Sequence, residues 1–114
     1  MQANYNQNWN YKEITLFPYK EFKQRCKLLF DMYFDNESFD FISDSHYYCG
    51  EGSHYFTILD KESFNELYTI TQNDCAGDLY FSVYCGDYNM NYKKENEYHF
   101  QSLTNAINFI ISRI

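Results

Sequence analysis

Hydrophobic residues recur at helical spacing in two segments of the chain. Between Tyr19 and Phe34, apolar side chains stand at positions 22, 26, 29, 30 and 33, and basic side chains fill the opposite side. This is the pattern of an amphipathic helix. After Ser102, a residue type that caps helix N-termini, apolar residues at 103, 106, 107, 110 and 114 form a second stripe. Both segments are therefore expected to be helices with one buried face.

Alternation of apolar and polar residues predicts strands in the rest of the chain. The clearest strand runs from Leu79 to Cys85, with positions 79, 81, 83 and 85 on one face and Tyr80, Ser82 and Tyr84 on the other. Further strands are expected at 11–17, 39–42, 46–49, 54–59 and near 97–100, with a glycine-rich turn at 50–53.

A third helix is expected after Asp60. Asp60 is a capping residue type, and apolar residues follow it at helical spacing, at 64, 67, 68 and 71. The tetrapeptide at 48–51, Tyr-Cys-Gly-Glu, is echoed at 84–87 as Tyr-Cys-Gly-Asp, and each copy precedes a predicted strand and helix. The expected fold is therefore α+β, in the order β-α-(ββα)-(ββα), with a mostly antiparallel sheet and helices packed on one face.

Length and composition predict one domain. A chain of 114 residues with 45% hydrophobic and 22% aromatic content can form one core. Residues 1–10 alternate asparagine with other polar and aromatic residues and lack a core pattern, so we expect a loose N-terminal tail before a single α+β domain at 11–114.

The sequence also carries an expectation about location. Residues 1–6 have neither the basic start nor the apolar run of a secretory signal, and no segment has the length of a membrane span. We therefore expect a cytoplasmic protein, in the host cytoplasm if a phage encodes it, whose four cysteines are reduced thiols.

The net charge of -7 is concentrated in the middle of the chain. Residues 31–92 contain twelve acidic residues and one basic residue, Lys61, whereas residues 1–30 and 93–114 each contain more basic than acidic residues. Nucleic acids and anionic lipids are bound chiefly through Lys and Arg, so the acidity disfavours both as direct partners. It favours a basic protein surface as the partner. The alternative is acidity that only keeps an aromatic protein soluble.

Catalytic and metal-binding patterns are weak. The six Cys and His residues at 46, 49, 54, 75, 85 and 99 are zinc-ligand types, but only His46 and Cys49 are closely spaced. No nucleophile turn supports a catalytic cysteine, and the glycines form no phosphate-binding array. We expect a protein that is not an enzyme and needs no cofactor. A small metal-dependent regulator or enzyme that uses the Cys and His residues is the alternative.

Tyrosine and carboxylate side chains are expected to share one exposed surface. Tyrosine is a favoured interface anchor because it joins a large apolar ring to a polar tip. Carboxylates pair with the Arg and Lys residues that normally grip a phosphate backbone. The candidate partner-binding residues are Tyr47, Tyr48, Glu51, Tyr55, Asp78, Tyr80, Tyr84, Asp87 and Tyr88.

In its size, acidity and aromatic content, the chain resembles a class of small inhibitors. Phages deploy such inhibitors as anti-CRISPR proteins or DNA mimics, and bacteria deploy them as immunity proteins. The resemblance implies a protein that blocks the basic surface of a nucleic-acid-acting enzyme, such as a nuclease or a CRISPR effector. A structural adaptor whose tyrosine face joins copies of itself, for example as a homodimer, is a further alternative.

Overall fold

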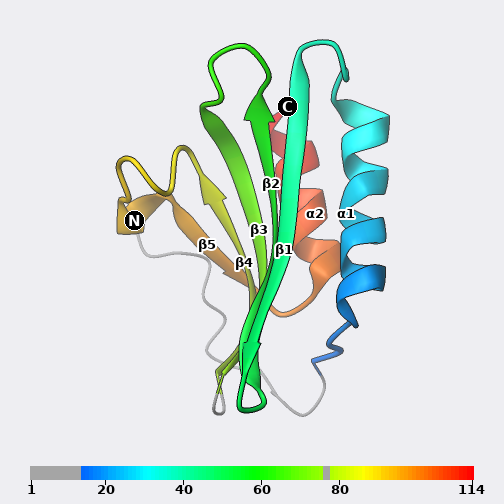
Figure 1. Ribbon diagram of the computed structural model, residues 1–114, viewed down its shortest axis with the longest axis vertical. Helices are drawn as coiled ribbons and strands as arrows, with labels where there is room; N and C mark the ends of the chain where they lie inside the picture. Colours follow the sequence, from blue (N-terminus) through cyan, green and yellow to red (C-terminus); the bar gives the residue numbers. More distant parts are fainter. Residues whose placement is uncertain (1–13, 76–77) are drawn as a thin grey trace.

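A computed structural model describes residues 14–75 and 78–114, which form a sheet layer and a helix layer (Figure 1). The sheet has five antiparallel strands that lie side by side in chain order. They are β1 (Phe39–Tyr48), β2 (Glu51–Asp60), β3 (Glu66–Cys75), β4 (Asp78–Cys85) and β5 (Glu97–Phe100). The helix layer contains α1 (Tyr19–Tyr33) and α2 (Leu103–Arg113), and a short 3-10 turn, η2 (Lys94–Asn96), precedes β5.

The core lies between the two helices and one face of the sheet. Figure 1 shows both helices on the same side of the strands. The buried cluster joins residues of the three central strands to the apolar faces of both helices: Phe56, Ile58, Ile70, Phe81 and Val83 with Phe22, Cys26, Leu29, Phe30, Leu103, Ala106 and Ile110. Within the described residues, neither helix covers the other face of the sheet.

The expected α+β class, the antiparallel sheet and the two amphipathic helices are confirmed. Ser102 caps α2 as expected, because its hydroxyl accepts the backbone N–H of Asn105 at 3.1 Å. The alternation of β4 is also confirmed, since Phe81 and Val83 lie in the core while Tyr80 and Tyr84 face the other way. Neither described helix has the length and apolar content needed to cross a membrane.

The prediction of a third helix after Asp60 is wrong, because residues 66–75 form the strand β3. The Asp60 carboxylate does accept the Ser63 N–H and hydroxyl, each at 2.8 Å, but these bonds close one turn, after which Phe64 takes a positive φ of 62°. From Tyr68 to Thr71, apolar and β-branched polar residues alternate, which suits a half-buried strand better than a helix. The observed order is therefore α-β-β-β-β-β-α. The first of the two expected ββα units is wrong, because a strand and not a helix follows β2.

The β1–β2 hairpin has longer strands and a shorter turn than expected. β1 is one continuous strand of ten residues, and its turn consists of Cys49 and Gly50, not of residues 50–53. Both turn residues have positive φ, 55° and 80°, as a two-residue type I′ hairpin turn requires.

Residues 14–18 form no strand, although Ile14, Leu16 and Phe17 pack against the core, so the expected strand at 11–17 is wrong for residues 14–17. The Phe17 N–H donates to Gln72 Oε1 at 3.0 Å, and Gln72 Nε2 donates back to the Phe17 carbonyl at 2.9 Å. His54 Nε2 donates to the same carbonyl at 3.1 Å and its Nδ1 accepts from the Ser45 hydroxyl at 2.7 Å, which fits a neutral imidazole. Burial lowers the pKa of His54 accordingly. Residues 11–13 and the expected tail at 1–10 lie outside the described part of the chain.

Candidate functional site

The sheet face opposite the helices, here called the open face, collects polar side chains from all five strands. Directly paired residues of antiparallel strands point to the same face, so the register fixes which side chains are neighbours. One row across the sheet contains Ile42, Thr57, Thr69, Tyr84 and Glu97, and the next contains Asp44, Tyr55, Thr71, Ser82 and His99. A third row contains His46, Ser53, Asn73 and Tyr80.

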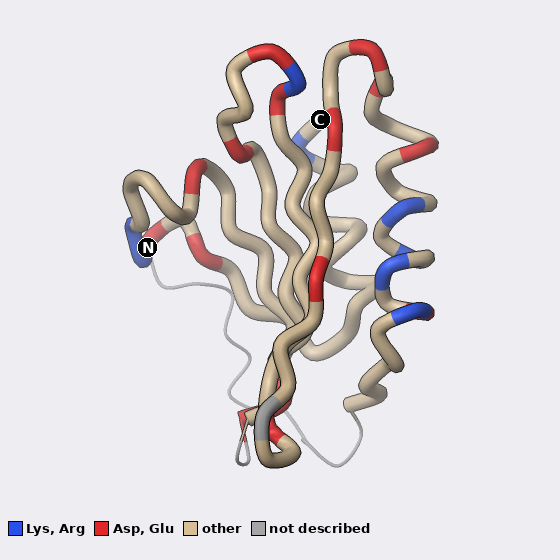
Figure 2. The backbone as a smooth tube through the Cα atoms, in the orientation of Figure 1, with Lys and Arg blue, Asp and Glu red and all other residues tan. Residues whose placement is uncertain are grey.

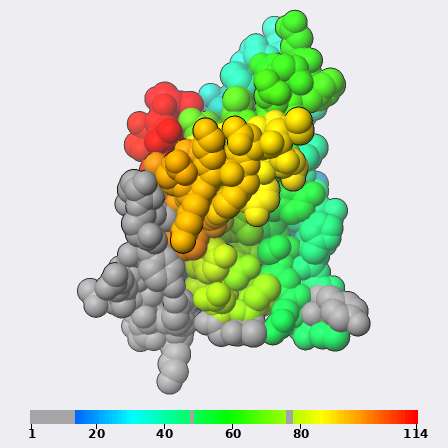
Figure 3. Space-filling model, turned by 90° about the vertical axis from the view of Figure 1, so that its left-hand side faces the viewer, coloured from blue at the N-terminus to red at the C-terminus, as the bar shows by residue number. Residues whose placement is uncertain are grey.

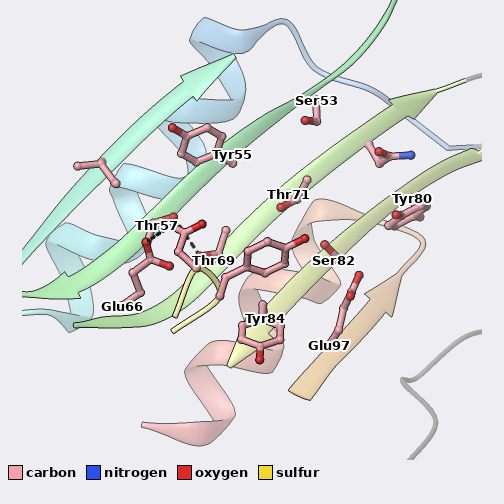
Figure 4. A pocket seen from close by; sticks show the side chains of 14 residues that line it. Ser53, Tyr55, Thr57, Glu66, Thr69, Thr71, Tyr80, Ser82, Tyr84 and Glu97 are labelled. Atoms are coloured by element: carbon pink, nitrogen blue, oxygen red, sulfur yellow. Dashed lines mark hydrogen bonds between the residues drawn. The ribbon is translucent and has the colours of Figure 1, made fainter. Parts of the chain in front are cut away.

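A groove of about 440 Å³ runs along the middle of the open face (Figure 4). It is lined by the residues of these rows other than Asp44, His46 and His99, together with Glu66, Tyr88 and Asn89. Figure 4 shows Thr69 and Thr71 on the central strand, with Tyr55 on one side and Tyr80, Tyr84 and Glu97 on the other. The groove therefore lies between a tyrosine of β2 and the tyrosines of β4.

Small hydroxyl side chains form the floor of the groove. Thr57 on β2 and Thr69 on β3 share a hydrogen bond of 3.0 Å between their hydroxyls. Thr71, Ser53 and Ser82 continue the lining along the sheet. Because these side chains are much shorter than tyrosine, the row between the aromatic walls is hollow.

The connection between β4 and β5 closes one end of the groove. Figure 3 shows the yellow and orange residues of this segment as a ledge that stands above the yellow-green start of β4. Tyr84 holds the segment in place, because its hydroxyl donates to the Asn91 carbonyl at 3.1 Å and accepts the Lys93 N–H at 2.6 Å. The rings of Tyr84, Tyr88 and Tyr92 lie with their centroids 5.1–5.2 Å apart. Tyr84 is only 2% exposed, so it serves mainly as the anchor of this cluster.

Two carboxylates lie at this closed end. Glu66 Oε2 accepts the side-chain amide of Asn89 at 2.9 Å. Glu97 accepts His99 Nε2 at 2.9 Å and the Tyr92 hydroxyl at 2.5 Å. The hydrogen bond from His99 and then the one from Tyr92 lower the pKa of Glu97 against its partial burial, and the hydrogen bond to Glu97 raises the pKa of Tyr92. Glu97 is therefore a carboxylate at neutral pH.

Tyr80 lies at the other end of the groove, backed by a ring outside the lining. The rings of Tyr80 and His99 are stacked, with centroids 4.4 Å apart. Burial, assisted by the charges of Glu97 and Asp78, raises the pKa of Tyr80 to about 12. Tyr80 is therefore neutral at physiological pH, and its hydroxyl can donate or accept a hydrogen bond.

Charge is separated between the two layers of the molecule. The five strands contain eight carboxylates and no lysine or arginine. Four of the basic residues lie on α1: Lys20, Lys23, Arg25 and Lys27. Figure 2 shows this basic helix on one side and acidic residues on the strands and their connecting loops. The strand register directs six of the eight carboxylates to the open face and Asp60 and Asp74 to the helix side, so the open face carries most of the negative charge of the strands.

The structure brings together some of the expected partner-binding residues and separates others. Tyr55, Tyr80, Tyr84 and Tyr88 all line the groove. Tyr47 lies on the helix side of the sheet, with its ring 5.1 Å from that of His54. Three carboxylates stand outside the groove: Glu51 and Asp78 at the first residues of β2 and β4, and Asp87 in the β4–β5 connection. The side chain of Tyr48 lies outside the described part of the structure.

Sequence reasoning missed Glu66, Glu97, Asn89 and the hydroxyl floor. Residues 66–71 were expected to be helical, and a helix would have carried Glu66, Thr69 and Thr71 away from the sheet face. The alternation of Thr69 and Thr71 with Tyr68 and Ile70 identifies the two threonines. Glu66 reaches the open face through a shift of the strand register between Ile58 and Leu59. Glu97 reaches the groove because β5 pairs with β4, and Asn89 reaches it through the fold of the β4–β5 connection. The periodicity of residues along the chain predicts neither.

The Cys and His residues do not form a cluster in the described structure. Over residues 14–75 and 78–114, no three His, Cys, Asp or Glu side chains converge closely enough to hold a metal ion. Cys26 is buried in the core and burial raises the pKa of its thiol. Both ring nitrogens of His54 are engaged by Ser45 and Phe17, as described above.

Comparison with known proteins gives no family for this chain. It matches no protein-family model, no curated protein and no solved structure. What the groove binds is therefore inferred from its own residues.

Proposed function

We propose that this chain is a non-enzymatic inhibitor whose open face binds and blocks a basic surface of a nucleic-acid-acting enzyme. The partner is a nuclease or a CRISPR effector, as for anti-CRISPR proteins, DNA mimics and immunity proteins. The observation that supports this most is the separation of charge: eight carboxylates and no lysine or arginine lie in the strands, while α1 behind them is basic. A surface of this kind competes with phosphate groups for arginine and lysine.

Among the described residues, the carboxylates of the open face lie beside histidines at most: Asp44 is 3.9 Å from His46 and Glu97 is 2.9 Å from His99. Asp40, Asp44 and Glu66 form no ion pair with a lysine or arginine anywhere in the described part of the chain. The basic residues Arg25 and Lys27 instead pair with Glu21 and Asp31 on α1 itself, each at 2.8 Å. The negative charge of the face is therefore available to a partner, and it will speed association with a basic surface at low salt.

The face is also suited to binding because it is held rigidly. Every central strand is paired on both sides, and the core beneath the sheet fixes its position. Tyrosine side chains have few rotatable bonds, so placing them against a partner costs little conformational entropy.

Inhibition of cleavage tests this proposal. A panel of DNA-cleaving, RNA-cleaving and RNA-guided nucleases is assayed with and without the protein at low and high salt. We expect inhibition of at least one enzyme, relieved by salt and by excess nucleic acid. The double variant Asp40→Asn, Asp44→Asn lowers the charge of the open face outside the groove. The double variant Glu37→Gln, Glu62→Gln makes the same change of charge in exposed loops and serves as the control.

The expected result is an affinity loss of about tenfold for the open-face variant and little change for the loop variant. Equal inhibition by both variants, or inhibition unaffected by salt, contradicts the electrostatic mechanism. Failure to inhibit any enzyme of the panel contradicts the proposed class of partner.

Self-association through the edge of the sheet is less well supported. β1 is an edge strand, whose outward N–H groups would form the bonds to a second copy. The carboxylates of Asp40 and Asp44 already accept the N–H groups of the residues after them, Phe41 and Ser45, at 2.8 and 2.7 Å. Both carboxylates would also repel their counterparts in an added copy. A solution-size measurement that gives a dimer would favour the adaptor alternative instead.

A further inference from the structure

We infer that the groove receives an extended peptide segment of the partner, with an arginine side chain seated at the closed end beside Tyr88, Glu66 and Glu97. This inference rests on the proposed function for the source of the peptide. The chemistry of the groove, however, can be tested without knowing the partner.

Hydrogen-bond acceptors dominate the lining of the groove. Of the 14 lining residues, 13 carry a side-chain oxygen, and none is a lysine, arginine or histidine. The only nitrogen donors are the amides of Asn73 and Asn89, and both are engaged, with the Asp78 carbonyl at 2.7 Å and with Glu66 at 2.9 Å. The hydroxyls can donate or accept, but Glu66 and Glu97 only accept, so a ligand that supplies several donors complements this groove. Guanidinium supplies five N–H donors and no acceptor.

The closed end has the charge and the aromatic surface that a guanidinium requires. Glu66 receives a hydrogen bond only from the neutral amide of Asn89, so its negative charge has no cation beside it in the described structure. Tyr88 is 48% exposed and presents part of its ring to the groove. A cation held against a tyrosine ring and a carboxylate gains from both interactions.

The same arrangement argues against a neutral carbohydrate, which also binds tyrosine and hydroxyl groups. Sugar hydroxyls could bond to the floor, but they would leave the charge of Glu66 uncompensated in a partly desolvated groove. A cationic side chain compensates it.

The shape of the groove fits an extended segment. The lining residues of β3 run from Glu66 to Asn73, which is about 23 Å at the usual rise of 3.3 Å per strand residue. An extended peptide of about six or seven residues has this length. An arginine side chain fills the closed end, and the flanking residues lie along the threonine floor between Tyr55 and Tyr80.

Blocked hexapeptides test the inference. Three peptides carry a single arginine, lysine or citrulline among glycine and serine residues, and citrulline is the neutral isostere of arginine. Binding is followed by NMR on protein labelled at the threonine methyl groups, at low ionic strength. We expect shifts at Thr57, Thr69 and Thr71, with the arginine peptide tightest, the lysine peptide weaker and the citrulline peptide weakest.

Two pairs of variants locate the arginine. Glu66→Gln removes the unpaired charge and should weaken the arginine peptide on the order of tenfold. Tyr88→Ala removes the ring and should weaken it about fivefold. The controls are Glu62→Gln, the same change in an exposed loop, and Tyr33→Ala, which removes a ring of equal exposure (47%) from α1. Neither control should change binding, and circular dichroism confirms that all four variants remain folded.

Other outcomes separate this inference from the proposed function. Equal binding of the arginine and citrulline peptides, or shifts produced by a disaccharide panel and not by the peptides, overturns the arginine site. An absence of peptide binding in a protein that still inhibits a nuclease overturns the groove alone. Peptide binding with no inhibited nuclease supports the groove and leaves the nuclease proposal contradicted.

Discussion

The two faces of the sheet are built from the same strands but have opposite chemistry. Along β2, Phe56 and Ile58 enter the core while Tyr55 and Thr57 face the groove. On the core side, neighbouring rings such as Phe41 and Phe56 stack with centroids 4.7 Å apart. On the open side, hydroxyl and carboxylate groups bond to one another and leave a hollow. The difference indicates that contacts on the core side stabilise the fold, whereas the open face is free to bind a partner.

Replacing adjacent residues of β2 should show this division most strongly. Phe56→Ala removes a fully buried ring and should lower the free energy of unfolding by about 3–5 kcal/mol. Tyr55→Ala, next to it in the chain but on the open face, should cost about 1 kcal/mol or less. Urea denaturation measures both. Similar losses for the two variants would contradict the division between the faces.

Tyr84 is the open-face residue expected to behave like a core residue. Tyr84→Phe keeps the ring but leaves the Lys93 N–H and the Asn91 carbonyl without their partner. We expect a loss of stability of about 1–2 kcal/mol and faster hydrogen exchange at the Lys93 amide. The matched control is Tyr88→Phe, whose hydroxyl forms no hydrogen bond within the described residues and whose loss should be near zero. Unchanged exchange at Lys93 would contradict the anchoring role of Tyr84.

Glu97 should make the stability of the open face depend on pH. Its pKa is lowered in the folded protein, chiefly by the hydrogen bond from His99, so the unfolded chain binds a proton more readily. The stabilisation is therefore present above the unfolded pKa of about 4.3 and is lost as the pH falls through the lower folded pKa. Denaturation at a series of pH values from 7 to 3 should show a smaller acid loss for Glu97→Gln than for the wild type. Identical pH profiles would rule out this contribution.

The smallest effect is expected on the solvent-exposed side of α1, because this side belongs to neither face of the sheet. Lys27→Ala removes the exposed ion pair with Asp31, four residues away on the same helix. The expected loss is only about 0.3–0.5 kcal/mol, and it should shrink further in high salt. A thermal melt at two salt concentrations measures it. A loss above 1 kcal/mol would mean that α1 contributes to stability through more than its buried stripe.

The elements that sequence reasoning predicted correctly have strong local signals. α1 and α2 show complete apolar stripes, and β4 alternates without interruption, so each could be assigned from its own residues. β3 was missed because Asp60 and the spacing of Phe64, Leu67 and Tyr68 imitate a helix start. Pairing with β2 and β4 on both sides stabilises the strand and outweighs that local preference.

The candidate site was predictable only in part, for the same reason. Alternation placed Tyr80 and Tyr84 on the face away from the core, and the charge count placed the carboxylates in the middle of the chain. Which side chains become neighbours depends on strand register and on the folding of the β4–β5 connection, and both arise from contacts between distant residues. Periodicity along the chain thus specifies which residues avoid the core, whereas the groove exists because pairing sets Thr69 beside Tyr84 and brings Asn89 to Glu66.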